Sequence, residues 1–131
     1  MKTAKDLYQN PGDVYFFPSD YQPMLAEFGE ILVQVDDDGY QGDSRVLYRD
    51  GLRFGYLCFG WGSCSGCDAL QACDTVQEVQ ELMDELRDSI KWFDSAADAM
   101  QWIETHDWAG DYAYSEKFVT DALAVLRAGL T

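Results

Sequence analysis

Four cysteines lie in one short stretch of this chain, and two of them form a Cys-Ser-Gly-Cys motif. Cys64 and Cys67 make the motif, Cys58 precedes it and Cys73 follows it. Thiolates at this spacing can bind zinc, which takes four tetrahedral ligands in structural sites. They can also form a redox-active pair, because the first turn of a helix lowers the pKa of a nearby thiol. Clustered cysteines in a reducing compartment favour either chemistry over a structural disulfide.

Three interpretations of this stretch stay open from the sequence. A zinc site would use the pair Cys64 and Cys67 and take two more ligands nearby, for which Cys58 and Cys73 are the candidates, although Cys58 on its strand can be out of reach. The usual signal is two separated Cys-x-x-Cys pairs, and this chain has one. A redox site is supported by Trp61, since a tryptophan shortly before such a motif resembles the thioredoxin active site. However, a thioredoxin fold has further strands after the motif and a cis-proline facing it, whereas every proline here precedes it. In the third interpretation the glycines form a tight turn and the cysteines are small buried apolar residues.

The chain is strongly acidic, with 24 Asp and Glu residues against 9 Lys and Arg and a formal net charge of −15. Such a charge excludes nucleic acid and anionic membrane surfaces as direct ligands, because like charges repel, and it favours a basic protein as partner. The helical spacing of residues 75–93 places four carboxylates opposite the apolar stripe, and Trp92 falls on the same side. We call these four residues the acidic ridge: Glu78, Glu81, Glu85 and Asp88.

A tryptophan beside a row of carboxylates is typical of a protein-binding hot spot. The acidic ridge therefore predicts a non-enzymatic binding module, such as an inhibitor or DNA-mimicking decoy of a basic nucleic-acid-binding protein. The ridge has about one charge per 4 Å, whereas duplex DNA has about one per 1.7 Å. A mimic would thus need a second row beside the first, for which the candidates are Asp94, Asp98, Glu104, Asp107 and Asp111.

Two other functions compete with this interpretation. The first is a zinc-binding or thiol-redox protein that uses Cys64 and Cys67. The second is a small scaffold whose acidity only keeps it soluble. The sequence has no phosphate-binding loop and no motif for a hydrolase, so it does not predict an enzyme. We expect no cofactor, with zinc as the alternative.

The elements that position these residues form one domain over residues 1–131. Alternating apolar residues predict a three-stranded antiparallel meander, in which Asp50-Gly51 makes a two-residue hairpin turn. This turn would place Leu47 opposite Phe54. We divide the domain into an extended aromatic arm (1–23), the sheet (31–60), a Gly/Cys connection (61–74) and helices (75–128).

Two capping boxes predict where helices begin. The pattern Thr75 to Glu78 opens a helix that extends to about Phe93, and Ser95 to Asp98 opens a short second one. A last helix covers residues 115–127. Strands followed by helices predict an α+β fold, with about three helices packed on one face of the sheet.

The Gly/Cys connection also resembles a known family. Residues 55–70, with the earlier Tyr40-Gln-Gly-Asp43, are similar to small acidic phage and bacterial proteins of unknown function that share a GWGSCSGCDAL-like motif. The similarity extends over residues 40–108, implies a phage or bacterial origin, and transfers no catalytic residue. The first residues lack the apolar run of a signal peptide, and no stretch approaches the roughly 18 apolar residues of a membrane span. We therefore expect a cytoplasmic protein, in the host cytoplasm if it is phage-encoded.

Overall fold

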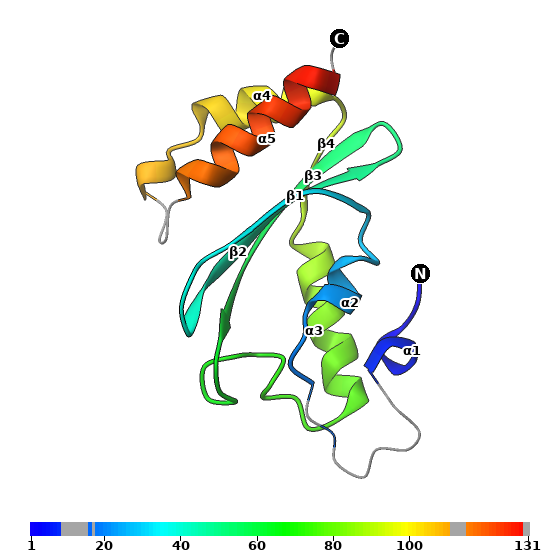
Figure 1. The fold of residues 1–131 in the computed structure, drawn as a ribbon. Coiled ribbons are helices and arrows are strands. Elements are labelled where there is room, and N and C mark those ends of the chain that lie inside the picture. The colour runs from blue at the N-terminus through cyan, green and yellow to red at the C-terminus, as the bar shows by residue number, and fades with distance from the viewer. Residues whose placement is uncertain (9–15, 17, 111–114, 130–131) are drawn as a thin grey trace.

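The computed structural model describes residues 1–8, 16, 18–110 and 115–129. A four-stranded antiparallel sheet runs through the centre of the molecule with helices on both sides (Figure 1). The strands, in their order across the sheet, are β1 (Glu30–Asp36), β2 (Gln41–Asp50), β3 (Arg53–Gly62) and β4 (Lys91–Phe93). The helices are α1 (Ala4–Tyr8), α2 (Gln22–Leu25), α3 (Val76–Asp88), α4 (Ala96–Thr105) and α5 (Glu116–Gly129), with a 3-10 turn at Trp108–Gly110. The predicted α+β class is confirmed.

The fourth strand corrects the prediction of one helix over residues 75–93. Helix α3 ends at Asp88, and Lys91–Phe93 pairs with β3 instead. The strand fits there because Gly55 leaves room for Trp92: a Cβ added to Gly55 would lie 2.8 Å from the indole ring. Tertiary pairing with the edge of the sheet has therefore overridden the helical spacing of this segment.

The β2–β3 hairpin forms as predicted, but its register differs by two residues. Leu47 pairs with Tyr56 rather than with Phe54. The turn residues are consequently Gly51 and Leu52, and Gly51 supplies the left-handed backbone with a φ of 63°. Because side chains alternate with a period of two, this shift leaves every predicted side chain on its original face of the sheet.

Helices cover both faces of the sheet, so the prediction that they all pack on one face is wrong. Side chains on one face of the sheet form a core with α1, α2 and α3, among them Val46, Tyr48, Leu57 and Phe59. Side chains on the other face form a second core with α4 and α5, among them Leu47, Phe54, Tyr56 and Phe93. Five consecutive residues of β2 (44–48) are buried, as expected for a strand covered on both sides.

The N-terminal segment is partly helical rather than an extended arm. It contributes α1 and α2, and Met24 and Leu25 of α2 are fully buried against the sheet. Residues 9–15 and 17 of this arm lie outside the described residues. The predicted helix starts at Thr75 and Ser95 are confirmed, since each side chain accepts a backbone hydrogen bond at the start of its helix. Within the described ranges, no helix combines the length and apolar character needed to span a membrane.

Candidate functional site

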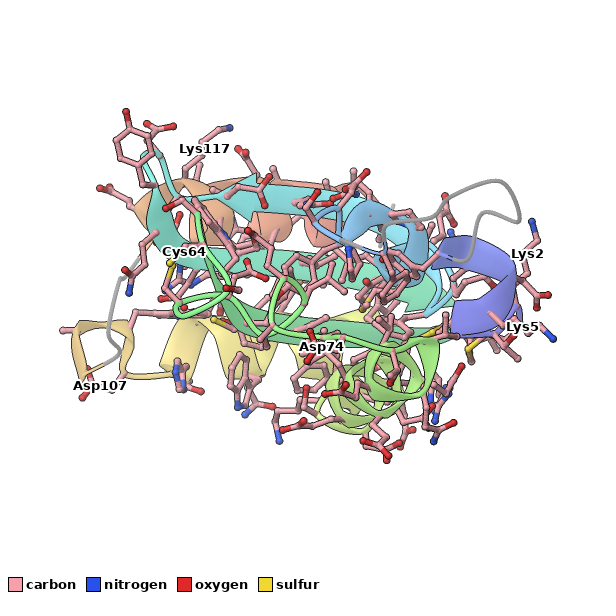
Figure 2. The ribbon with its side chains drawn as sticks, turned by 90° about the horizontal axis from the view of Figure 1, so that it is seen from below. Lys2, Lys5, Cys64, Asp74, Asp107 and Lys117 are labelled. Atoms are coloured by element: carbon pink, nitrogen blue, oxygen red, sulfur yellow. The ribbon has the colours of Figure 1, made fainter. Side chains whose placement is uncertain are left out.

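The Cys-x-x-Cys motif lies in the loop that connects β3 with α3. Cys64 stands on this loop at one end of the molecule, whereas Lys2 and Lys5 lie at the other end (Figure 2). The motif is a turn, closed by a hydrogen bond of 3.1 Å from the Cys67 N–H to the Cys64 carbonyl. Helix α3 begins only at Val76. The motif therefore does not occupy a helix N-terminus, and the helix dipole does not act on these thiols.

The buried carboxylate of Asp68 holds this loop against the end of β3. It accepts hydrogen bonds from the Gly62 N–H at 2.8 Å, the Leu70 N–H at 2.9 Å and the Gln71 N–H at 3.0 Å. The Tyr21 hydroxyl donates a fourth bond at 3.0 Å. Burial raises the pKa of Tyr21, which therefore stays protonated as a donor. One carboxylate thus joins the strand, the loop and the N-terminal segment.

Gly62 allows the motif to pack directly on the strand end. A Cβ added to Gly62 would lie 2.6 Å from both the carbonyl oxygen and the sulfur of Cys67. Gly66 lies in the same loop but has more space, since its added Cβ would be 3.9 Å from the Cys64 sulfur. Of these two glycines, only Gly62 is required by close contact.

The two sulfurs of the motif are in contact at the surface. The Sγ atoms of Cys64 and Cys67 are 2.7 Å apart, and the Cys64 N–H donates to the Cys67 sulfur at 3.1 Å. The side-chain hydrogen bond from Cys64, followed by the backbone one, lowers the pKa of Cys67. Cys64 is exposed and Cys67 half-buried. The interpretation of these two cysteines as buried apolar residues is therefore wrong, and the Cys67 thiol has a pKa below its ordinary value.

The distance between the sulfurs lies between the values for a disulfide and for two thiolates on one zinc ion. Two thiolates on one tetrahedral zinc lie about 3.8 Å apart, because each Zn–S bond is about 2.3 Å long. The sulfurs of a disulfide are about 2.04 Å apart. The observed 2.7 Å lies nearer to the second value. A small movement of either side chain would allow the bond to form.

The other two cysteines do not join the motif. Cys58 is an exposed residue of β3. Cys73 is 7% exposed, its thiol donates to the Ala69 carbonyl at 3.3 Å, and burial raises its pKa. Within the described residues, no three His, Cys, Asp or Glu side chains are placed to hold one metal ion. The predicted set of four zinc ligands is therefore not assembled in this part of the chain.

The acidic ridge lies on the exposed side of α3, but its members have different surroundings. Glu81 and Glu85 are exposed, and no Lys or Arg among the described residues approaches them within 4.0 Å. Asp88 lies 3.7 Å from the Nε of Arg87. Glu78 belongs to the capping box at the start of α3. The uncompensated part of the ridge is thus the middle of the helix.

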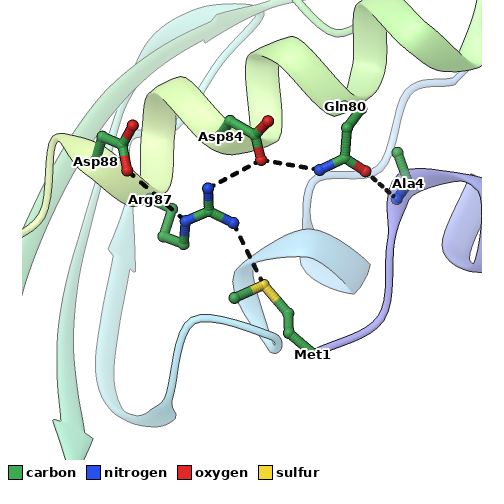
Figure 3. Close-up of polar contacts among 6 residues, drawn as sticks. All are labelled: Met1, Ala4, Gln80, Asp84, Arg87 and Asp88. Atoms are coloured by element: carbon green, nitrogen blue, oxygen red, sulfur yellow. Dashed lines mark hydrogen bonds and ion pairs between the residues drawn. The ribbon is translucent and has the colours of Figure 1, made fainter.

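The flank of the ridge is covered by the N-terminal segment, as Figure 3 shows. The Ala4 N–H donates to the Gln80 side chain at 2.7 Å. Arg87 donates to Asp84 at 3.0 Å and to the sulfur of Met1 at 3.7 Å. These contacts place the Arg87 guanidinium and the Met1 thioether beside the carboxylates, and the guanidinium reduces the local negative charge.

Trp92 and part of the proposed second acidic row do not lie beside the acidic ridge. Trp92 is part of β4 and the Arg53 guanidinium sits 4.4 Å from the centre of its ring. Of the proposed second acidic row, Asp98 and Glu104 belong to α4, on the opposite face of the sheet from α3. Asp111 lies outside the described residues. Asp98 and Glu104 therefore do not form a second row of charges beside α3.

Sequence reasoning missed Asp68 and Tyr21 as the residues that position the motif. Asp68 had a local signal, since an aspartate that accepts hydrogen bonds two and three residues ahead is a common turn former. Tyr21 had none, because it is 47 residues away from its partner.

Comparisons with protein families, with curated proteins and with solved structures find no match to this chain.

Proposed function

We propose that the protein performs thiol–disulfide exchange through Cys64 and Cys67. The observation that supports this proposal is the 2.7 Å contact between two sulfurs on an accessible turn, with the pKa of one thiol lowered. A thiolate is the attacking species in such exchange, so the lowered pKa makes Cys67 the nucleophile.

The reaction follows from the arrangement of the pair. The Cys67 thiolate attacks one sulfur of a substrate disulfide, forms a mixed disulfide and releases the first substrate thiolate. Cys64, after losing its proton to solvent, attacks the Cys67 sulfur and releases the second substrate thiolate. Two electrons pass to the substrate, both released thiolates take up protons, and the protein retains a Cys64–Cys67 disulfide.

Equilibration with mixtures of reduced and oxidised glutathione tests this proposal. We expect one intramolecular disulfide per chain, located between Cys64 and Cys67 by mass spectrometry of the digested protein. Cys58→Ser is the matched control, because it removes an exposed cysteine outside the turn and should leave this disulfide unchanged. The proposal fails if both cysteines stay reduced, or carry only glutathione, under conditions that modify Cys58.

Metal analysis of the same protein, purified without chelator, separates exchange from zinc binding. Zinc that co-purifies with the chain and is lost in Cys67→Ser would assign the pair to metal binding instead. The described residues offer only two thiolates at this site, so a tetrahedral ion would need further ligands.

We propose a second function for the acidic ridge: the binding of a basic protein, such as a nucleic-acid-binding protein that the chain inhibits. Support comes from Glu81 and Glu85, which are exposed and have no described cation within 4.0 Å, and from the net charge of −15. The double substitution Glu81→Gln with Glu85→Gln should weaken capture of such a partner at low salt. Asp98→Gln with Glu104→Gln is the control on the opposite face. Capture that is insensitive to both salt and the ridge variant would contradict this function.

A further inference from the structure

We infer that the substrate of the Cys64–Cys67 pair is a disulfide within an extended, positively charged polypeptide, which binds in the hollow beside Cys67. This inference rests on the proposed exchange function and specifies its substrate. It comes from three properties of the hollow: its position, its backbone surface and its charge.

The hollow lies where the strands end, directly next to the Cys67 thiol. It has a volume of about 750 Å³, and Cys67 forms part of its wall. The strand pairing Gly42↔Trp61 and Asp43↔Gly60 builds its floor. A molecule in the hollow would therefore touch the thiol and the end of the sheet at once.

The outer edge of β3 beside the hollow exposes backbone at Gly60. The N–H and C=O of Gly62 bond to Asp68 and Gln71 in the loop, so they point away from β2. Because a strand repeats every two residues, the N–H and C=O of Gly60 also point away from β2. Strand β4 flanks β3 only as far as Tyr56. In the described part of the chain, no strand lies beside Gly60. An extended peptide can pair with such an edge through its own backbone.

Carboxylates supply the charge of the hollow. Asp37 and Asp43 are part of its wall, and neither Lys nor Arg is among the described residues that form it. Arg45 lies 4.0 Å from Asp37 and lines a neighbouring cavity together with Asp43, so it offsets part of the charge of both carboxylates. The hollow thus suits Lys or Arg next to the substrate cystine.

Three disulfides separate the contributions of backbone and charge. The first is a cystine-bridged peptide with Lys on both sides of one half-cystine, and the second is the same peptide with Glu in place of Lys. The third is cystamine, which is positively charged but has no peptide backbone. Single-turnover rates with the reduced protein are divided by the rates of the same disulfides with free dithiothreitol, which removes their intrinsic reactivities.

We expect the Lys peptide to have the highest corrected rate, about threefold to fivefold above the Glu peptide at low salt, and less at high salt. Asp43→Asn should lower the ratio of the Lys to the Glu peptide. Asp38→Asn is the matched control: it makes the same change on the exposed β1–β2 turn, outside the hollow, and should leave the ratio unchanged.

Equal corrected rates for the two peptides, or a corrected rate for cystamine that equals that of the Lys peptide, would overturn the inference. Either result would leave the exchange function in place, because exchange itself would have been observed. Absence of exchange with all three disulfides would instead refute the proposed function.

Discussion

The substitution Asp68→Asn tests whether one buried carboxylate holds the thiol pair in position. Asparagine has nearly the same shape but has one acceptor oxygen and one donor NH₂ group. If its oxygen keeps the three bonds from Tyr21, Leu70 and Gln71, its NH₂ group faces the Gly62 N–H, and two donors then oppose each other at the present distance of 2.8 Å.

The expected loss of stability follows from these contacts. The hydrogen bond to Gly62 is lost and leaves a buried donor unsatisfied, which costs about 1–3 kcal/mol. The remaining three bonds lose the charge of the acceptor and weaken. Because Asp68 is only 4% exposed, water cannot replace these partners. We expect the free energy of unfolding to fall by about 2–4 kcal/mol.

Urea unfolding followed by tryptophan fluorescence measures this loss. Asp74→Asn is the matched control, because Asp74 lies in the same loop with an exposed side chain, and its substitution should change stability by less than about 0.5 kcal/mol. Tyr21→Phe should cost about 1 kcal/mol alone and less in the Asp68→Asn background, since the two side chains share one bond. If Asp68→Asn were no more destabilising than the control, the carboxylate would not organise the loop.

Three further outcomes are expected. Gly62→Ala should destabilise the protein by about 1–3 kcal/mol in urea unfolding, because the added Cβ would overlap Cys67. Gly66→Ala is the control and should have little effect. Equal losses of stability in the two variants would contradict the close contact at Gly62. Thr75→Ala should cost about 1 kcal/mol in the same assay, since it removes the cap of α3, and unchanged stability would show that the cap is dispensable. The alkylation rate of Cys67 by iodoacetamide should rise with pH around a midpoint below the ordinary thiol value of 9.0, because a lowered pKa keeps the thiolate at lower pH. Cys64→Ala should move this midpoint upward, which peptide mass spectrometry can follow; a midpoint that stays in place would remove the assigned cause.

The thiol pair and the acidic ridge show how far a site can be predicted from residue spacing. Two cysteines three positions apart in a turn must lie close together, so Cys64 and Cys67 were identifiable without a structure. Whether Cys58 and Cys73 join them depends on the direction of β3 and on burial, which residue spacing does not give: Cys58 is exposed and Cys73 is buried. Trp92 was misassigned for a similar reason, because helical spacing continues past Asp88 although the helix does not.

Local chemistry determined much of this protein before any tertiary contact was known. The net charge follows from composition alone. The three strands of the meander, the capped starts of α3 and α4, and the Cys-x-x-Cys turn depend on residues within a few positions of one another. Only the tertiary structure decided that β4 joins the sheet, that helices cover both its faces, and that Tyr21 and Asp68 meet beneath the thiols. These features depend on burial and pairing between segments far apart in the chain, and the free energy of such contacts does not appear in the local pattern of residues.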